Sequence, residues 1–195
     1  MLLSAYEQGL FPWYSEGRPI LWHSPDPRFV LFPEKLHISQ SMKKILRQNR
    51  YKITFNTDFS GVIRGCADIT RPGQDGTWIT ADMINAYTEL HRLGWAHSAE
   101  AWTDEPKTLV GGCYGILIDN VFFGESMFSL SPNASKAAFL TLARYLFGKG
   151  IVFIDCQVQT DHLESLGAQT MPRKDFLALL RKYMVNRRPN TVTGE

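Results

Sequence analysis

The chain has 195 residues, which suits one ordinary domain with a substantial core, or one domain with a small appendage. Its content of 44% hydrophobic, 21% charged and 12% aromatic residues is typical of a globular protein and excludes a collagen-like or long disordered chain. The formal net charge is only +2, so any basic surface that meets nucleic acid must be local.

No signal for a membrane, a metal or a disulfide is found in the sequence. No apolar run reaches the roughly 18 residues of a spanning helix, and MLLSAYEQG lacks the charged start and long apolar middle of a signal peptide, so we expect a cytoplasmic protein without a membrane partner. Cys66, Cys113 and Cys156 form no C-x-x-C pair, and we interpret them as small buried hydrophobic residues. The histidines show no ligand spacing, so no metal is expected.

The first third of the chain contains short elements rich in aromatic residues. We predict a helix over 2–9, a bend over 11–19, and strands over 20–22 and 28–32. Five large rings crowd into seventeen residues of this segment: Tyr6, Phe11, Trp13, Tyr14 and Trp22. Such a cluster usually belongs to a core, but beside prolines it can also line a wall on which a planar ligand stacks.

A basic helix is predicted after this segment, with Ser39 as its cap. Its apolar side is formed by Met42, Ile45 and Leu46. Its basic side is formed by Lys43, Lys44, Arg47 and Arg50. A basic stripe of this kind is usually a solvated face, although it can also follow a row of phosphates.

The middle of the chain predicts two helices and an antiparallel hairpin. A strand over 51–56 precedes a helix from about Asp58, a loop over 71–76, and a helix capped by Thr80 that ends at Gly94. Strands follow over 97–102, 109–118 and 121–129, the last two joined by a turn at 119–120.

The last third is predicted to be helix, strand and short elements. They are a helix over 133–150, a strand from Ile151 to Gln157, a short helix over 161–167, an extended piece over 168–172, a helix over 174–184, and a frayed tail over 187–195.

Asp155 and Gln157 stand out because they follow four apolar residues at the end of a buried strand and share one face of it. One explanation is structural: Asp155 only caps the next turn, and Glu125 pairs with a surface lysine. The other explanation is chemical, and it depends on what the fold is.

The order of the elements resembles the core of the GCN5-related N-acyltransferase fold. We therefore expect an α+β protein: a mixed sheet flanked by helices over 36–195, and a small N-terminal α/β domain over 1–35. Members that use acyl-CoA hold its pyrophosphate in a glycine-rich turn at a helix N-terminus. No glycine lies between Ser126 and Ala138, so we expect no coenzyme A and no other cofactor.

Eight motifs, in order and over nearly the whole chain, resemble those of the bacterial leucyl/phenylalanyl-tRNA protein transferase family: GLFPWYSEGRPILWHSPDPR, HISQSMKK, GTWIT, AYTELHRLGWAHSAEAW, LVGGCYG, FFGESMFS, NASK and IDCQVQTDHLESLGA. The resemblance implies transfer of Leu or Phe, and Met less readily, from tRNA to proteins that begin with Arg or Lys, which marks them for degradation in the N-degron pathway (N-end rule). The ester donor is already activated, so neither metal nor covalent nucleophile is required. Family members carry a longer N-terminal stretch, so the small first domain is expected to be incomplete.

The same resemblance assigns the catalytic pair to Asp155 and Gln157. An α-amine with a pKa near 8 is only about one tenth neutral at pH 7, so a base assists the attack. Asp155 would accept or relay the proton and Gln157 would orient Asp155 or the amine. Asp155 and Glu125 would supply negative charge for the cationic acceptor.

The resemblance also assigns the substrate contacts. The slot for the aminoacyl side chain is expected at Cys113, Phe122, Glu125, Phe139, Leu142, Leu146 and Ile154. Family members usually have a larger residue at the position of Cys113, which leaves the preference between Leu and Phe open. Aromatic contacts to the terminal adenosine and substrate are expected at Tyr6, Trp13, Trp78 and Tyr87.

Contacts to the tRNA backbone are expected at Lys43, Lys44 and Arg47. Gln40 and Gln48 stand where basic residues are common, which predicts weaker binding and a shallower salt dependence. Two other functions remain open: an N-acyltransferase that uses another activated donor, and a tRNA-binding module without catalysis.

Overall fold

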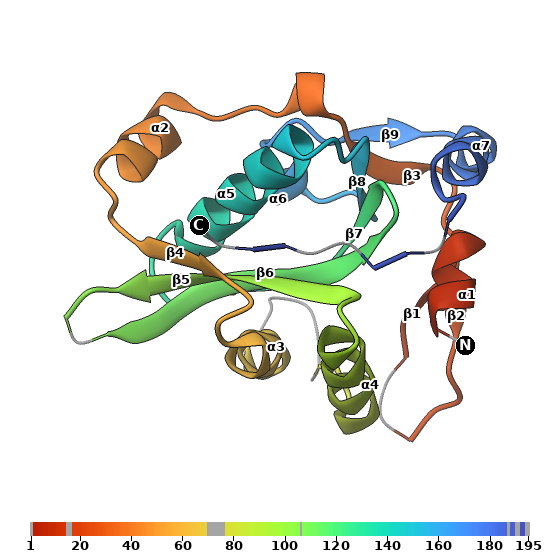
Figure 1. The fold of residues 1–195 in the computed structure, drawn as a ribbon, viewed down its shortest axis with the longest axis horizontal. Helices are drawn as coiled ribbons and strands as arrows, with labels where there is room; N and C mark the ends of the chain where they lie inside the picture. Colours follow the sequence, from red (N-terminus) through yellow and green to blue (C-terminus); the bar gives the residue numbers. More distant parts are fainter. Residues whose placement is uncertain are drawn as a thin grey trace.

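The computed structural model describes residues 2–14, 17–69, 77–105, 107–186, 188–189 and 192–193 (Figure 1). The strands are β1 (Phe11–Pro12), β2 (Trp22–His23), β3 (Arg28–Leu31), β4 (Lys52–Phe55), β5 (Ala96–Thr103), β6 (Thr108–Ile118), β7 (Val121–Ser129), β8 (Phe153–Gln157) and β9 (Gln169–Met171). The helices are α1 (Leu2–Glu7), η1 (Pro33–Lys35), α2 (Gln40–Arg47), α3 (Phe59–Asp68), α4 (Ala81–Arg92), α5 (Ala134–Gly148), α6 (Asp161–Glu164) and α7 (Arg173–Tyr183). The loop predicted over 71–76 lies outside the described residues.

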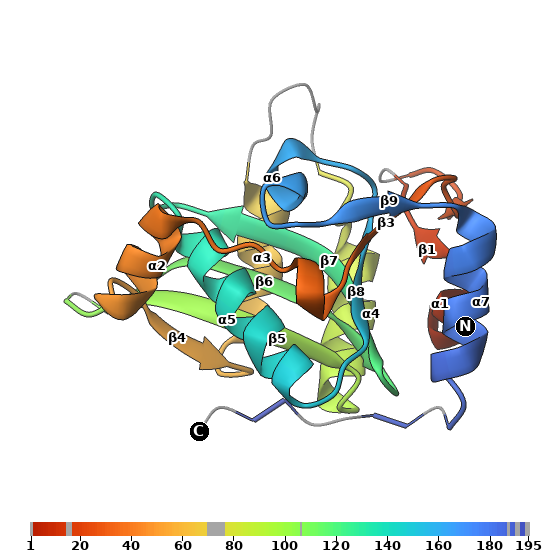
Figure 2. The same cartoon turned by 90° about the horizontal axis from the view of Figure 1, so that it is seen from above.

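A seven-stranded mixed sheet runs in the order β4-β5-β6-β7-β8-β3-β9 and forms the middle layer. Helices α2 and α5 cover one face, and α3 and α4 cover the other (Figure 1). The two-stranded β1–β2 sheet lies beside α1 and α7 at one end (Figures 1 and 2). This arrangement confirms the predicted fold class of a mixed sheet flanked by helices with a small N-terminal appendage.

The predicted helix starts are confirmed by their caps. The Ser39 hydroxyl accepts the amide N–H of Met42, the Asp58 carboxylate accepts that of Gly61, and the Thr80 hydroxyl accepts that of Met83. Each cap satisfies one of the amides that a helix leaves unpaired at its first turn.

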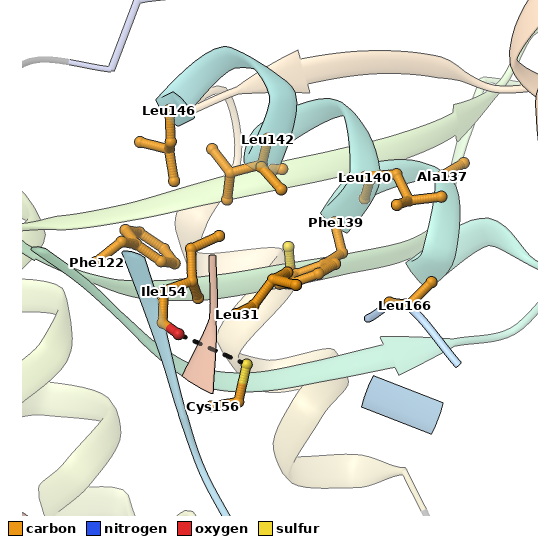
Figure 3. Packing of buried hydrophobic residues seen from close by; sticks show 14 of the residues in the cluster. Leu31, Phe122, Ala137, Phe139, Leu140, Leu142, Leu146, Ile154, Cys156 and Leu166 are labelled. Carbon is orange, nitrogen blue, oxygen red and sulfur yellow. Dashed lines mark hydrogen bonds between the residues drawn. The ribbon is translucent and has the colours of Figure 1, made fainter. Parts of the chain in front are cut away.

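The core is divided by the sheet into two apolar layers. The layer under α2 and α5 holds Phe122, Phe139, Leu142, Leu146 and Ile154, which point toward one another in Figure 3. The layer on the opposite face contains buried residues of α1, α3, α4 and α7. The sequence therefore places α5, in which nine of fifteen residues are buried, over the strands that form the site.

Strands β7 and β8 separate after a short parallel contact. Their paired residues run from Val121 with Phe153 to Phe123 with Asp155, while β7 continues to Ser129. Gln157 at the end of β8 has a φ of 63°, a left-handed conformation that breaks the strand. The two strand ends consequently lie apart, and the candidate site lies between them.

The boundary of the predicted N-terminal domain at residue 35 stays a prediction. Strand β3, which falls within the first 35 residues, lies inside the main sheet between β8 and β9. The elements before β3, namely α1, β1 and β2, are not part of that sheet.

The tail prediction is wrong for the described residues 188–189 and 192–193. The Arg188 amide donates to the Asp119 carboxylate at 3.0 Å, and the Asn56 side chain donates to the carbonyl of Val192 at 2.6 Å. Val192 is buried and packs in the apolar layer under α2 and α5. Within the described chain, no helix combines the length and the apolar character needed to cross a bilayer.

Candidate active site

A cavity of about 720 Å³ opens between the separated ends of β7 and β8. This volume lies within the usual range of small-molecule sites. The residues on its walls include Trp13, Trp78, Cys113, Tyr114, Phe122, Glu125, Phe139, Ile154, Cys156, Gln157 and His162. Most of this wall is apolar, so the few polar groups on it are the candidates for chemistry.

The structure brings most of the residues assigned to the apolar slot to the cavity wall, and their role as a slot stays a prediction. Cys113, Phe122, Phe139 and Ile154 line the cavity. Leu142 and Leu146, by contrast, are fully buried on α5 and are absent from the cavity wall. They pack behind Phe122 and Ile154 (Figure 3) and therefore support the slot from outside it.

Glu125 is the single carboxylate among the described residues that line the cavity. Its Oε1 accepts the Tyr6 hydroxyl at 2.7 Å and the Gln157 amide nitrogen at 3.2 Å, and its Oε2 accepts the Tyr87 hydroxyl at 2.9 Å. Burial raises the pKa of Glu125 to about 7, and the nearby charge of Asp155 adds to this, while the three hydrogen bonds oppose it. Glu125 therefore changes its protonation state near neutral pH.

Tyr6 and Tyr87, which were expected among the aromatic contacts to the adenosine and substrate, do not reach the cavity in this structure. Both side chains are fully buried and do not line the cavity. Their hydroxyl oxygens lie 2.5 Å apart, and both donate to Glu125. Burial and the charge of Glu125 raise the pKa of each phenol, so both remain protonated donors.

Trp13 and Trp78 lie where an aromatic contact to a ligand is possible. Both line the cavity, with ring centroids 6.2 Å apart. Trp13 is 41% exposed, which is high for so large an apolar side chain and leaves ring surface free for stacking.

Asp155, which was expected to accept or relay the proton and to supply charge to the acceptor, does not reach the cavity in this structure. Asp155 is 0% exposed and is absent from the cavity wall. Arg28 binds it with two parallel bonds, from Nε to Oδ1 at 2.8 Å and from NH2 to Oδ2 at 2.6 Å. The reason is the pairing of β3 with β8, which places an opposite charge beside the carboxylate and closes it off.

Arg28 is a site residue that the sequence analysis missed. It is 0% exposed, and its guanidinium lies 4.8 Å from the ring centroid of Phe11 and 4.6 Å from that of Phe176. Its NH1 donates to the carbonyl of Gly9 at 3.1 Å, in the turn after α1. The available signal was a charged residue at the start of the apolar run RFVL, just as Asp155 is a charged residue in an apolar strand.

Asp155 and Gln157 do form a pair, but through the backbone. The Gln157 amide N–H donates to Asp155 Oδ1 at 2.9 Å, and this bond supports the left-handed backbone at Gln157. The Gln157 side chain can then reach Glu125. Arg28, Asp155, Gln157 and Glu125 thus form one connected polar chain that ends at the cavity.

The basic residues of α2 lie on its outer side. Lys43, Lys44 and Arg47 are all exposed, while Met42 packs into the core. Their predicted contact with tRNA stays a prediction.

The three cysteines are buried and free, as predicted. Burial raises the thiol pKa of Cys113 and Cys156, so both line the cavity as neutral thiols. No group of three or more His, Cys, Asp or Glu side chains within reach of one metal ion occurs in the described part of the chain.

Comparison with known proteins gives one family. The family model described as leucyl/phenylalanyl-tRNA protein transferase matches residues 30–181, and that of the N-terminal domain of the same protein matches residues 1–26. Relatives named leucyl/phenylalanyl-tRNA–protein transferase are 53% identical in Myxococcus xanthus (strain DK1622) and 55% identical in Pseudomonas fluorescens (strain Pf0-1). Each alignment spans 183 residues and 94% of this chain, and covers 77% and 80% of the relatives.

Proposed function

From the premise that this chain belongs to the leucyl/phenylalanyl-tRNA protein transferase family, we propose that it moves Leu or Phe, and Met less well, from tRNA to the N-terminal Arg or Lys of proteins. Family membership itself makes the chain an aminoacyltransferase that uses aminoacyl-tRNA as donor and protein as acceptor. The choice of amino acid, the acceptor terminus and the resulting degradation of the acceptor belong to the proposal.

The observation that carries the proposal is a single cavity whose wall holds Glu125 together with apolar side chains and the rings of Trp13 and Trp78. Cys113, Phe122 and Ile154 offer a slot without charge, which suits a Leu or Phe side chain. A close-packed slot of this kind tolerates little branching near its entrance, so Val and Ile should be poor donors. The carboxylate beside it offers negative charge to an acceptor that begins with a cationic residue.

The donor tRNA would be held by two separate features. Trp13 and Trp78 can stack on the terminal adenosine, and such stacking is worth about 1 to 3 kcal/mol per base. Lys43, Lys44 and Arg47 can meet the phosphates of the acceptor stem. Neither feature reads a base sequence, so the specificity would come from the aminoacyl slot. Aminoacyl-tRNA is a cytoplasmic substrate, and we place the reaction there.

Catalysis of aminolysis depends mainly on bringing an amine and an ester carbonyl together in a good geometry. Asp155 would act through Gln157 rather than by contact with the amine, because both its oxygens are bound by Arg28 and the Gln157 amide. Gln157 would orient the reacting groups from the cavity wall.

The proposal is tested by incubating the protein with radiolabelled Leu-, Phe-, Met- and Val-tRNA and with peptides that begin with Arg, Lys, Ala or Glu. We expect product with Leu and Phe, less with Met and none with Val, and only on Arg and Lys peptides. An arm with acetyl-CoA and long-chain acyl-CoA covers the N-acyltransferase alternative. Transfer from acyl-CoA but from no charged tRNA would refute the proposal, and tRNA binding without any transfer would favour the non-catalytic module.

A further inference from the structure

The cavity presents one carboxylate where the proposed reaction needs a proton acceptor. Asp155 has no free path to the cavity, whereas Glu125 lies on its wall and is 8% exposed. We propose that Glu125 takes the proton from the attacking α-amine, and that Tyr6 and Tyr87 set the basicity of its carboxylate. This inference rests on the proposed aminoacyl transfer and names the base for it.

The hydrogen bonds around Glu125 leave room for this role. An ionised carboxylate offers about four acceptor positions. Tyr6, Tyr87 and Gln157 occupy three of them, and each approaches from a different element, namely α1, α4 and β8. The free position is on Oε2, which among the described residues accepts only the Tyr87 hydroxyl, and we assign it to the incoming amine because Glu125 borders the cavity. The three donors also fix the carboxylate, so it needs no rearrangement when it accepts the proton.

The surroundings of Glu125 suit a base that works near neutral pH. A carboxylate with an ordinary pKa is too weak a base for an amine, and the most effective catalytic pKa lies near the working pH. Burial raises the pKa of Glu125 to about 7. The polar groups that face it from the packed elements are the phenols of Tyr6 and Tyr87, the amide of Gln157, and the Arg28–Asp155 ion pair behind them. The phenols donate without a positive charge, so they hold the carboxylate while leaving it basic.

The proposed step is balanced without any further reactant. The amine nitrogen attacks the ester carbonyl carbon, a C–N bond forms, and the C–O bond to the terminal ribose breaks. One proton leaves the nitrogen for Glu125, and the departing ribose oxygen takes one proton up. Glu125, now a neutral acid, can return its proton to that oxygen and so regain its starting state.

His162 is the competing base on the cavity wall. Its Nε2 is buried without a hydrogen-bond partner in the described chain, and burial lowers its pKa, so it is a neutral imidazole at pH 7. It lies on α6 and, within the described chain, its Nε2 forms no hydrogen bond, so it lacks the fixed orientation that Glu125 has. The experiment must nevertheless separate the two residues.

The test compares pH profiles of kcat/KM for Phe transfer to an Arg-initiated peptide. The acid side of the wild-type profile should contain the ionisation of the peptide amine, near pH 8, and a second ionisation near pH 7. Glu125→Gln, which keeps the shape of the side chain, should remove the second ionisation and lower kcat by about 10² to 10⁴-fold. Tyr6→Phe and Tyr87→Phe should each move it to higher pH without moving the amine ionisation, since each removes a bond that favours the carboxylate.

Chemical rescue distinguishes a base from a merely structural carboxylate. Glu125→Ala leaves space for formate in the cavity, so added formate should restore part of its transfer rate and should not help Asp155→Ala. Affinity for Phe-tRNA, measured on the same variants, shows how much of each loss arises in donor binding rather than in the transfer step. If Glu125 variants do not fold, the shifts of the two Tyr→Phe variants decide the question.

Three results would overturn the inference. The first is an ionisation near pH 7 that survives in Glu125→Gln. The second is the loss of that ionisation in His162→Gln, and the third is an ionisation that stays at the wild-type pH in both Tyr→Phe variants. A wild type that transfers normally alongside any of these results would leave the proposed function intact. A wild type that transfers nothing from any charged tRNA would refute the proposed function itself.

Discussion

Replacement of Asp155 by Asn should destabilise the whole protein, because it leaves the Arg28 guanidinium buried without its counterion. Both side chains are 0% exposed and are joined by bonds of 2.6 and 2.8 Å. Breaking a buried pair by removing one partner costs about 3 to 5 kcal/mol. A domain has a total stability of about 5 to 15 kcal/mol, so the loss is at least a fifth of it and can be most of it.

The assay is equilibrium unfolding in urea, followed by circular dichroism. With a slope of about 2 to 3 kcal/mol per molar urea, the midpoint should fall by about 1 to 2.5 M. The matched control is the double variant Arg28→Met with Asp155→Leu. Apolar residues can replace a buried ion pair at little cost, and Arg28 already lies between the rings of Phe11 and Phe176. The double variant should therefore recover most of the midpoint.

Transfer activity distinguishes two roles of the Arg28–Asp155 pair, namely stabilising the fold and positioning Gln157. The double variant should fold and still transfer slowly, because Leu at position 155 cannot accept the Gln157 amide bond that holds the left-handed backbone. A midpoint for Asp155→Asn equal to wild type would show that the pair does not stabilise the fold. A stable double variant that transfers at the wild-type rate would show that Asp155 has no role in positioning Gln157.

Three further predictions follow from the site. Lys43→Ala with Arg47→Ala should weaken all charged tRNAs alike and reduce the slope of log affinity against log salt by about 2, and unchanged affinity at low salt would remove α2 from the tRNA surface. Cys113→Met should fill part of the slot and lower the ratio of Phe to Leu transfer, measured in competition; an unchanged ratio would place the ligand side chain elsewhere. Burial raises the pKa of Glu125 from 4.5 to about 7, so the folded protein holds this proton more tightly than the unfolded chain does. The free energy of unfolding should therefore fall as the pH rises from 4.5 to about 7. Glu125→Gln should flatten that part of the pH curve relative to wild type, and parallel curves would contradict the assigned pKa.

The sequence could predict what depends on neighbours along the chain. The caps at Ser39, Asp58 and Thr80 are local signals, and each one begins a helix in the structure. The turn at 119–120 joins two antiparallel strands, as predicted. These features need only the side chains within one or two turns of the residue concerned.

The ion pair of Arg28 and Asp155 could not be predicted in this way, because the two residues are 127 positions apart. Their contact depends on β3 entering the sheet beside β8, and no local pattern fixes that order of strands. The family resemblance assigned Asp155, Tyr6 and Tyr87 to the site but could not say whether each one borders the cavity. Burial decides that point, and burial is a property of the packed sheet and helices rather than of any motif.

The two carboxylates of the site differ in the partners that surround them, and this difference divides their tasks. Asp155 is bound by a guanidinium, so its charge is neutralised and its oxygens are fully used for holding Arg28 and the Gln157 backbone. Glu125 is bound by neutral donors only, among the described residues, and it borders the cavity. A carboxylate that is to accept a proton must have a low cost of becoming neutral, and a counterion would raise that cost. The residue without a cation is therefore the one suited to the chemistry, and the residue with a cation is the one suited to holding the site in place.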